Sequence, residues 1–174
     1  CQQKGVKLEP HPITSLSELD SFDRIVVTTG AATLQLKECS HLPITPIKGQ
    51  ILELLWPKGL PSLPYCLNSQ AYLTPSSQPG HYIAGATFER YFQTTKPDCA
   101  IAENEILPKI AAFLPAINEA KIISCRAGVR ASGPKHLPLV KQLSDNVWVL
   151  TGMGSKGLLY HALHAQELVK DILA

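Results

Sequence analysis

The chain has 174 residues, of which 45% are hydrophobic and 17% are charged, and this composition is typical of a folded protein rather than a disordered one. Its formal net charge of +2 is too small to indicate nucleic-acid binding by itself. Five scattered cysteines without a CxxC pair argue against a disulfide framework or a zinc site, and no apolar run is long enough to cross a membrane, so a reducing cytoplasmic setting is expected.

The first half of the chain predicts mainly β-strands. Residues 5–9 are a candidate short strand, and residues 17–22 are polar and typical of a turn. Residues 23–30 concentrate β-branched side chains and end in a glycine, which predicts a buried strand followed by a turn. After two prolines that break the chain, residues 47–55 predict another strand.

The middle of the chain predicts a hairpin, a helix and a further strand. Residues 71–74 and 81–88 flank a turn that contains proline and glycine, which is typical of paired strands. Apolar residues recur with helical spacing over residues 104–114, and this start places Pro108 near the first turn, where proline is tolerated. Residues 121–129 predict the next strand.

The last quarter has the most informative pattern, a strand followed by a glycine-rich turn and a helix. Residues 147–150 are apolar, residues 151–157 contain three glycines, and residues 158–173 are amphipathic. Such a turn directs free backbone N–H groups and the positive end of a helix dipole toward one point. It therefore suits a phosphate, a carboxylate or the electron-rich edge of a cofactor ring, although a plain turn would have the same glycines.

Two sharper motifs do not match this turn. A phosphate-binding P-loop requires Lys and then Ser or Thr after its last glycine, whereas Leu158 and Leu159 follow Gly157. A nucleophile elbow requires a glycine two residues before its serine, whereas Met153 occupies that position before Ser155. The turn therefore provides no support for nucleotide hydrolysis or esterase chemistry.

His161 and His164 lie three residues apart on the last predicted helix, and Glu167 is their only acidic neighbour on that face. Because no complete ligand set is present, a solvated polar face is favoured over a metal site.

Four segments, taken in order, resemble the D-amino-acid-oxidase and glycine-oxidase superfamily of FAD-dependent enzymes. They are residues 23–31 (DRIVVTTGA), 42–54 (LPITPIKGQILEL), 71–88 (AYLTPSSQPGHYIAGATF), and 125–140 together with 147–168. Residues 72–75, 136–138 and 154–157 are in turn most similar to the family's oxidoreductase domains that modify tRNA wobble uridines. The resemblance covers nearly the whole chain.

The resemblance implies an α+β fold in three segments. Residues 44–127 would form a mixed-sheet substrate domain with flanking helices. Residues 1–43 and 128–174 would form incomplete α/β elements of an FAD-binding domain. FAD is the implied cofactor, but the chain is expected to lack the GxGxxG that opens members of this family at the N-terminus and holds the FAD pyrophosphate. We therefore expect the C-terminal part of a longer protein, which on its own binds FAD weakly and is inactive without the N-terminal segment.

The chemistry of the family is the oxidation of a C–N bond by hydride transfer to flavin, for which the protein supplies orientation and electrostatics. The resemblance places Arg130 at the substrate carboxylate and Tyr72 as a substrate-facing hydroxyl. A surface arginine and a half-buried strand tyrosine are the plain alternatives. The residues that it places near the cofactor are Gly30, Gly49, Gln50, Gly128, Gly152, Met153, Gly154, Ser155, Lys156, Gly157 and Leu158.

Two positions depart from the family pattern. Lys135 stands where the family commonly has Asp, and Lys141 stands where it tends to have glycine, which weakens the expectation of catalysis. The expected substrate is an amine or amino acid, either a small amino acid or a tRNA-linked aminomethyl group. The alternative is a non-catalytic binding or assembly domain that keeps a flavoenzyme-like fold.

Overall fold

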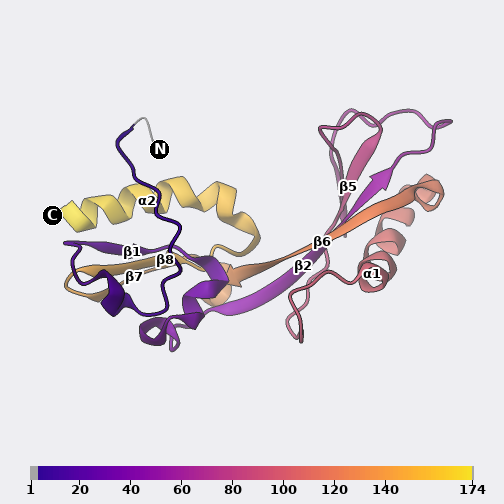
Figure 1. Cartoon of the computed structure of the whole chain (residues 1–174). Helices are drawn as coiled ribbons and strands as arrows, with labels where there is room; N and C mark the ends of the chain where they lie inside the picture. The colour runs from indigo at the N-terminus through magenta and orange to yellow at the C-terminus, as the bar shows by residue number, and fades with distance from the viewer. Residues whose placement is uncertain (1–3, 174) are drawn as a thin grey trace. The chain divides into compact units, whose positions relative to one another are not determined.

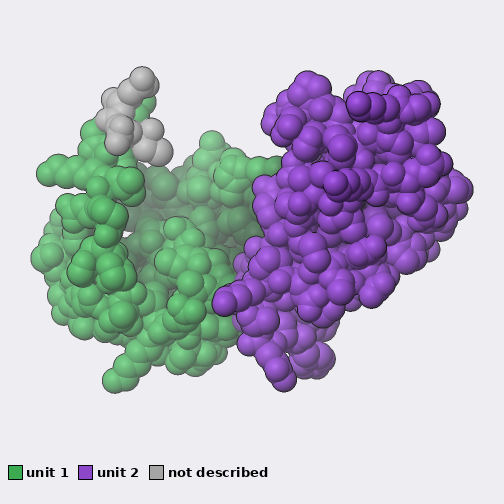
Figure 2. All heavy atoms as spheres, turned by 45° about the vertical axis from the view of Figure 1, so that its right-hand side comes forward, with its two compact units in different colours: residues 1–45, 131–174 green, residues 46–130 purple. Residues whose placement is uncertain are grey.

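The computed structural model describes residues 4–173, and the chain divides into two compact units (Figure 2). Unit 1 comprises Cys1–Thr45 and Ala131–Ala174, and unit 2 comprises Pro46–Arg130. The boundaries fall inside β2 (Thr45–Leu55) and β6 (Lys121–Ser132). Cys1 and the ends of the two predicted flavin-domain segments, residues 1–3 and 174, lie outside the described residues. Strands and helices in both units confirm the α+β class.

Unit 2 is built on a five-stranded sheet with the order β3-β4-β5-β2-β6 (Figure 1). The predicted hairpin is confirmed, because β4 (Tyr72–Pro75) pairs antiparallel with β5 (His81–Gly85). On the outer sides of this hairpin, β3 (Leu67–Asn68) pairs antiparallel with β4, and β2 pairs antiparallel with β5. β5 ends at Gly85, three residues before the predicted end, and β2 begins two residues before its predicted start.

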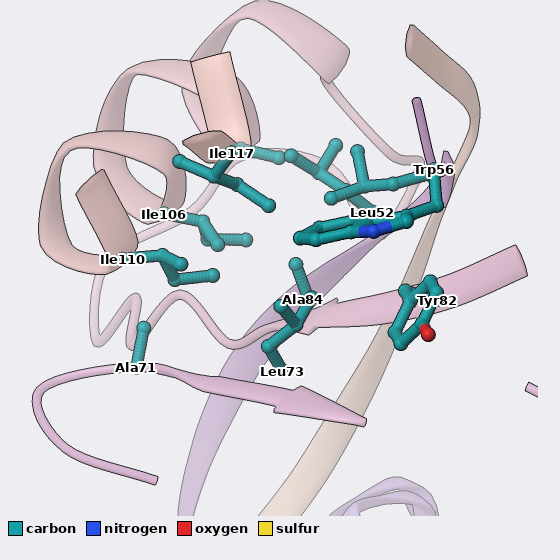
Figure 3. Packing of buried hydrophobic residues seen from close by; sticks show 11 residues of the cluster. Leu52, Trp56, Ala71, Leu73, Tyr82, Ala84, Ile106, Ile110 and Ile117 are labelled. Atoms are coloured by element: carbon teal, nitrogen blue, oxygen red, sulfur yellow. The ribbon is translucent and has the colours of Figure 1, made fainter. Parts of the chain in front are cut away.

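One face of this sheet packs against α1 (Cys99–Ala111) and the 3-10 helix η5 (Pro115–Glu119). Figure 3 shows isoleucines from these two helices directed at side chains from the strands. The members with no exposed surface are Leu52, Leu54, Leu73, Ala84, Ala102, Ile106, Ile110 and Ile117. Burial of each large aliphatic side chain contributes about 1.5–3 kcal/mol. Strand alternation turns the intervening residues, such as Gly49 and Tyr72, toward the opposite face.

α1 starts at Cys99, five residues before the predicted start. The Asp98 carboxylate accepts a hydrogen bond from the backbone N–H of Ile101 at 3.1 Å, and this cap fixes the start of the helix. Pro108 consequently lies in the helix interior, so its predicted place near the first turn is wrong. Packing of Ile106 and Ile110 outweighs the hydrogen bond that proline cannot donate.

Unit 1 contains a three-stranded sheet with the order β1-β8-β7 (Figure 1). β1 (Ile25–Val27) is parallel to β8 (Val147–Thr151), and β7 (Leu139–Ser144) is antiparallel to β8. The strands predicted over residues 23–30 and 147–150 are confirmed, although β1 is shorter than predicted. The polar residues of β7 make its strand pattern too weak to predict. The strand predicted at residues 5–9 is absent, since those exposed residues have no sheet partner.

Both faces of β8 are covered. Val147 and Val149 pack with β1 and with the segment that holds the 3-10 helices η2 (Leu16–Leu19), η3 (Gly30–Gln35) and η4 (Lys37–Cys39). Trp148 and Leu150 pack with Leu168 of α2 (Gly157–Leu173), which confirms the predicted last helix. No helix among residues 4–173 is long and apolar enough to span a membrane.

Candidate functional site

The open face of the unit 2 sheet carries a cleft of about 430 Å³ between two neighbouring strands. Gly49 and Ile51 from β2 line one side, and residues 126–130 of β6 line the other. Alternation along β6 places Arg126, Gly128 and Arg130 on the same face. The cleft therefore has two guanidinium groups and an exposed glycine between them.

The guanidinium of Arg130 lies directly over the backbone of Gly49. A Cβ at Gly49 would stand 2.5 Å from both terminal nitrogens of Arg130, so a side chain at this position would displace the guanidinium. Among residues 4–173, no carboxylate lies within ion-pair distance of Arg130. A half-buried guanidinium without an internal counter-ion is suited to bind an external anion, and its geometry favours a bidentate carboxylate.

The Tyr72 side chain lies over a second glycine, as Arg130 lies over Gly49. Tyr72 is the cross-strand partner of Gly85, and a Cβ at Gly85 would stand 2.7 Å from the tyrosine hydroxyl. The same point lies 2.9 Å from the side chain of Ile51, which also lines the cleft. The Tyr72 hydroxyl therefore lies beside the Ile51 wall of the cleft, on the face that carries Arg130.

Gln50 points the other way, into the interior of unit 2. Its side chain has no exposed surface, donates to the Glu89 carboxylate at 2.9 Å and accepts from the backbone N–H of Asp98 at 2.6 Å. Lys48, which is also buried, pairs with Glu89 at 3.5 Å. Burial raises the pKa of Glu89, but hydrogen bonds from Thr87 and Gln50 and the charge of Lys48 outweigh it and keep this pKa below its ordinary value.

Arg126 has a different environment from Arg130. It is exposed, and its charge helps to lower the pKa of Glu53, although hydrogen bonds from His81 and Ser124 are the larger causes. Arg126 is therefore partly balanced by a carboxylate of its own unit, whereas Arg130 is not.

The glycine-rich turn of unit 1 has the backbone that its sequence predicts. Gly152 and Gly154 have φ of +75° and +56°, which favours glycine at both positions. The turn continues through η7 (Gly154–Lys156) into α2, and no side chain caps the start of η7. Ser155, Lys156 and Leu158 are exposed at this helix start, where the Lys156 N–H donates to the Met153 carbonyl at 3.0 Å.

The glycines at 152, 154 and 157 have the spacing G-x-G-x-x-G. They follow β8, a strand with a parallel neighbour, and they open a helix of 17 residues. Dinucleotide binding by glycines of that spacing also requires a second parallel strand after the helix, and no strand follows α2 among residues 4–173. The prediction that the chain lacks this motif is nevertheless wrong, because glycines 152, 154 and 157 have its spacing.

A second loop of unit 1 packs against this turn. The Gly133 N–H donates to the Gly152 carbonyl at 2.8 Å, and a Cβ at Gly152 would stand 3.1 Å from the Gly133 backbone. In the same loop, Lys135 and His136 have φ of 55° and 60°, in the left-handed region that is costly for residues with a side chain. Asp, the residue expected at position 135 from the family resemblance, tolerates that region better than Lys.

Gly30 is held at the same end of the unit 1 sheet, because the Thr151 hydroxyl donates to its carbonyl at 3.2 Å. The structure thus gathers Gly30 and the turn at 152–158 within unit 1, and Gly49, Gly128, Arg130 and Tyr72 on one sheet face of unit 2. His164 pairs with Glu167 at 2.8 Å, and residues 4–173 contain no cluster of three metal-ligating side chains.

The family model described as "FAD dependent oxidoreductase" (DAO) matches residues 1–170. The chain belongs to this FAD-dependent oxidoreductase family. It is 32% identical over 176 residues to the tRNA 5-methylaminomethyl-2-thiouridine biosynthesis bifunctional protein MnmC of Hahella chejuensis, covering 91% of this chain and 27% of that protein. The MnmC protein of Polaromonas sp. JS666 is 31% identical, with 86% and 27% covered. The chain therefore spans about a quarter of the length of these relatives.

Solved structures share the fold. Glycine oxidase from Geobacillus kaustophilus superposes with a TM-score of 0.71 at 22% identity, covering 86% of this chain and 40% of that one. L-proline dehydrogenase from P. horikoshii superposes with a TM-score of 0.67 at 18% identity, covering 84% and 41%. At this level of identity the likeness shows the fold alone.

Proposed function

We propose that this chain supplies the substrate-anchoring face and the flavin-edge turn of an FAD-dependent oxidoreductase that oxidises a C–N bond of an amine or amino acid. The observation that carries the proposal is Arg130, a half-buried guanidinium that lies in a cleft over Gly49 with no carboxylate partner among the described residues. In this proposal unit 2 (residues 46–130) belongs to the substrate domain and unit 1 to the FAD-binding domain. The two boundaries of the predicted substrate segment, residues 44–127, then move by two and three residues, which places Gly128 and Arg130 in the substrate domain.

Each group has a separate role. Arg130 would bind the substrate carboxylate bidentately, and the Tyr72 hydroxyl would orient the same group by a hydrogen bond. Backbone N–H groups at Gly152–Leu158 would donate to an electron-rich edge of FAD, which their positive-φ bend and uncapped helix start suit. The chemistry that bound FAD would supply is that of a hydride acceptor for the carbon next to the substrate nitrogen. Gln50 would act only by positioning, since its buried amide holds Glu89 and Asp98.

The test of the anion site compares two arginines of the same strand in the full-length natural protein. Arg130→Met should lower kcat/KM for a carboxylate-bearing amine by about 10²-fold or more, because the substrate charge loses its partner. Arg126→Met removes an equal charge that Glu53 already balances, and a much smaller loss is expected. For an amine that lacks the carboxylate, neither substitution should lower kcat/KM. Equal losses for both variants would contradict the assignment of Arg130.

The alternative, a non-catalytic binding or assembly domain, rests on the lysines at positions 135 and 141. A visible absorption spectrum of the full-length protein separates it from the enzyme. A bound-flavin spectrum that bleaches anaerobically with an amine supports the oxidoreductase. A protein that lacks flavin and takes up none from added FAD would support the binding domain instead.

The substrate class can be tested with the same protein. MnmC relatives are named for tRNA 5-methylaminomethyl-2-thiouridine biosynthesis, and glycine oxidase is named for a small amino acid. We infer that a tRNA-linked aminomethyl group that also bears a carboxylate for Arg130 is the better candidate, because the relatives above 30% identity carry the tRNA name. Anaerobic bleaching by modified tRNA at a lower concentration than by glycine would support this, and the reverse order would favour the small amino acid.

A further inference from the structure

Two cysteines meet on the buried side of the unit 2 sheet, away from the arginine cleft. Cys125 is half-buried on β6, and Cys99 is the exposed first residue of α1. Cys99 lies near enough to Cys125 to add to the effect of burial in raising the pKa of the Cys125 thiol, and the Gln50 amide oxygen contacts both the Cys125 thiol and the backbone N–H of Asp98, the residue before Cys99. The two cysteines are separated by 26 positions in the sequence, with no CxxC spacing, so the sequence does not indicate that they meet.

The surrounding contacts hold the two thiols in place. The Gln50 amide oxygen accepts from the Asp98 backbone N–H at 2.6 Å and from the Cys125 thiol at 3.7 Å. Asp98 is the N-cap of α1 and immediately precedes Cys99, so one amide oxygen fixes both the helix start and the strand thiol. The Gln50 amide is fixed in turn by its bond to Glu89. The other two described cysteines lack such an arrangement: Cys39 is fully buried and Cys66 contacts Thr74.

We propose that Cys99 and Cys125 form a peroxide-sensitive dithiol that closes to a disulfide between α1 and β6. Cys99 is the residue that a dissolved oxidant reaches, because it is exposed whereas Cys125 is half-buried. The cross-link would tie the capped end of α1 to the strand whose other face carries Arg126 and Arg130. It would be a modification site distinct from the cleft, and it does not depend on FAD.

The reaction has two steps. The Cys99 sulfur attacks one oxygen of hydrogen peroxide, the O–O bond breaks, and hydroxide leaves and is protonated to water. Cys99 becomes a sulfenic acid, oxidised by two electrons. The Cys125 sulfur then attacks the Cys99 sulfur, the S–O bond breaks, and the departing hydroxide combines with the Cys125 proton. Two thiols and one peroxide give one disulfide and two waters.

Closure should depend on pH. Burial raises the pKa of the Cys125 thiol to about 11, with further increases from Cys99 and from the Asp98 carboxylate, opposed by the charge of Lys48. Cys125 is therefore protonated near neutral pH, and the second step should accelerate about tenfold per pH unit as its thiolate fraction grows. The shared Gln50 contact keeps the two cysteines close in the folded chain, and because the attack is intramolecular this proximity compensates for the small thiolate fraction.

The test treats the reduced 174-residue chain with stoichiometric hydrogen peroxide and maps its tryptic peptides without reduction. Cleavage after Lys109 and Lys121 separates the two cysteines into peptides 91–109 and 122–126. The expected product is a single linked species of these peptides that has lost two hydrogens, with two of the five thiols consumed. Cys66→Ser is the control and should leave the link unchanged.

Variants then assign the order of the two steps. In Cys125→Ser, the Cys99 sulfenic acid should persist and be captured by dimedone, whereas Cys99→Ser should leave Cys125 unlabelled. Circular dichroism of the reduced variants establishes that they remain folded. If peroxide oxidises Cys66 while peptides 91–109 and 122–126 stay unlinked in the unmodified chain, the proposal is overturned. That result needs no variant and leaves the flavoenzyme proposal untouched.

Discussion

The two units differ in the burial of their cores and in how many backbone positions have a positive φ. Unit 2 has a core in which eight members are fully buried, and Gly80 is its only positive-φ position in residues 46–130. Unit 1 has glycines with positive φ at 5, 30, 152 and 154, and also Lys135 and His136 in that region. Glycine adopts positive φ without strain, but strain of the kind that Lys135 and His136 carry concentrates at ligand-binding and active sites. The comparison therefore suggests a scaffold in unit 2 and a shaped loop cluster in unit 1.

The main helices show the same contrast. α1 has a capping carboxylate, and three of its residues have no exposed surface. α2 begins without a side-chain cap on the preceding η7, and Leu158 and Leu159 are 94% and 71% exposed. An uncapped start leaves N–H groups for a ligand, whereas a capped start has already used them. The N-terminus of α1 is therefore closed by its own cap, whereas the N-terminus of α2 is suited to bind a ligand.

The largest expected effect comes from truncating one aliphatic side chain in each helix. Ile106→Ala in α1 should lower the free energy of unfolding by about 3 kcal/mol, because it leaves a cavity in a packed core. Leu159→Ala in α2 should change it by less than about 0.5 kcal/mol, because that side chain is exposed. Trp56 lies in unit 2 and Trp148 in unit 1, so urea unfolding can be followed in each unit separately in single-tryptophan backgrounds, Trp148→Phe for unit 2 and Trp56→Phe for unit 1. Equal losses would show that the outer face of α2 is covered in solution.

Glycines provide the second comparison. A Cβ at Gly133 would overlap the carbonyl oxygen of Leu137, a backbone atom, so the loop that packs on Gly152 would have to move. Gly133→Ala should therefore destabilise unit 1 by about 3 kcal/mol, seen as a lower urea midpoint for Trp148 fluorescence. Gly128→Ala is the control, since nothing lies within 4 Å of its Cβ position. An unchanged midpoint for Gly133→Ala would contradict the close packing of the two loops.

These glycines show where sequence-based prediction ends. Local patterns predict β8, α2 and the β4–β5 hairpin correctly, because apolar alternation and helical spacing are encoded over neighbouring residues. The positive φ of Gly152 and Gly154 also follows from a tight strand-to-helix turn. The close approach of Gly133 to Leu137 and of Gly49 to Arg130 depends on tertiary packing, which no local pattern records. The start of α1 was misplaced because a single cap residue, Asp98, decides it.

The buried ion pair of unit 2 gives the third effect. Glu89→Gln should cost about 2 kcal/mol at neutral pH, because Lys48 is buried and loses its counter-ion. The folded pKa of Glu89 is lowered, so its stabilisation is present above the ordinary value of 4.5 and is lost as the pH falls through the folded pKa. The difference between the wild type and the variant in Trp56-detected unfolding should therefore shrink in acid.

An exposed ion pair is the control for this effect. Glu105→Gln removes the pair with Lys109 at 3.8 Å on the surface of α1, and less than about 0.5 kcal/mol is expected at any pH. A pH-independent loss for Glu89→Gln would show that hydrogen bonding, and not charge, holds Lys48 in place.

The smallest expected effect is a gain, and it occurs in unit 1. Lys135 has φ of 55°, and a side chain in that region costs about 1–2 kcal/mol. Lys135→Gly should therefore stabilise unit 1 by about 1 kcal/mol, less the extra freedom of glycine in the unfolded chain. Lys135→Ala removes the same charge but keeps a Cβ, so it should bring no gain. A higher urea midpoint for Trp148 in the glycine variant alone would assign the cost to backbone conformation. A similar gain for alanine would assign it to the lysine charge, and the contrast between a relaxed unit 2 and a strained unit 1 would then lose its clearest example.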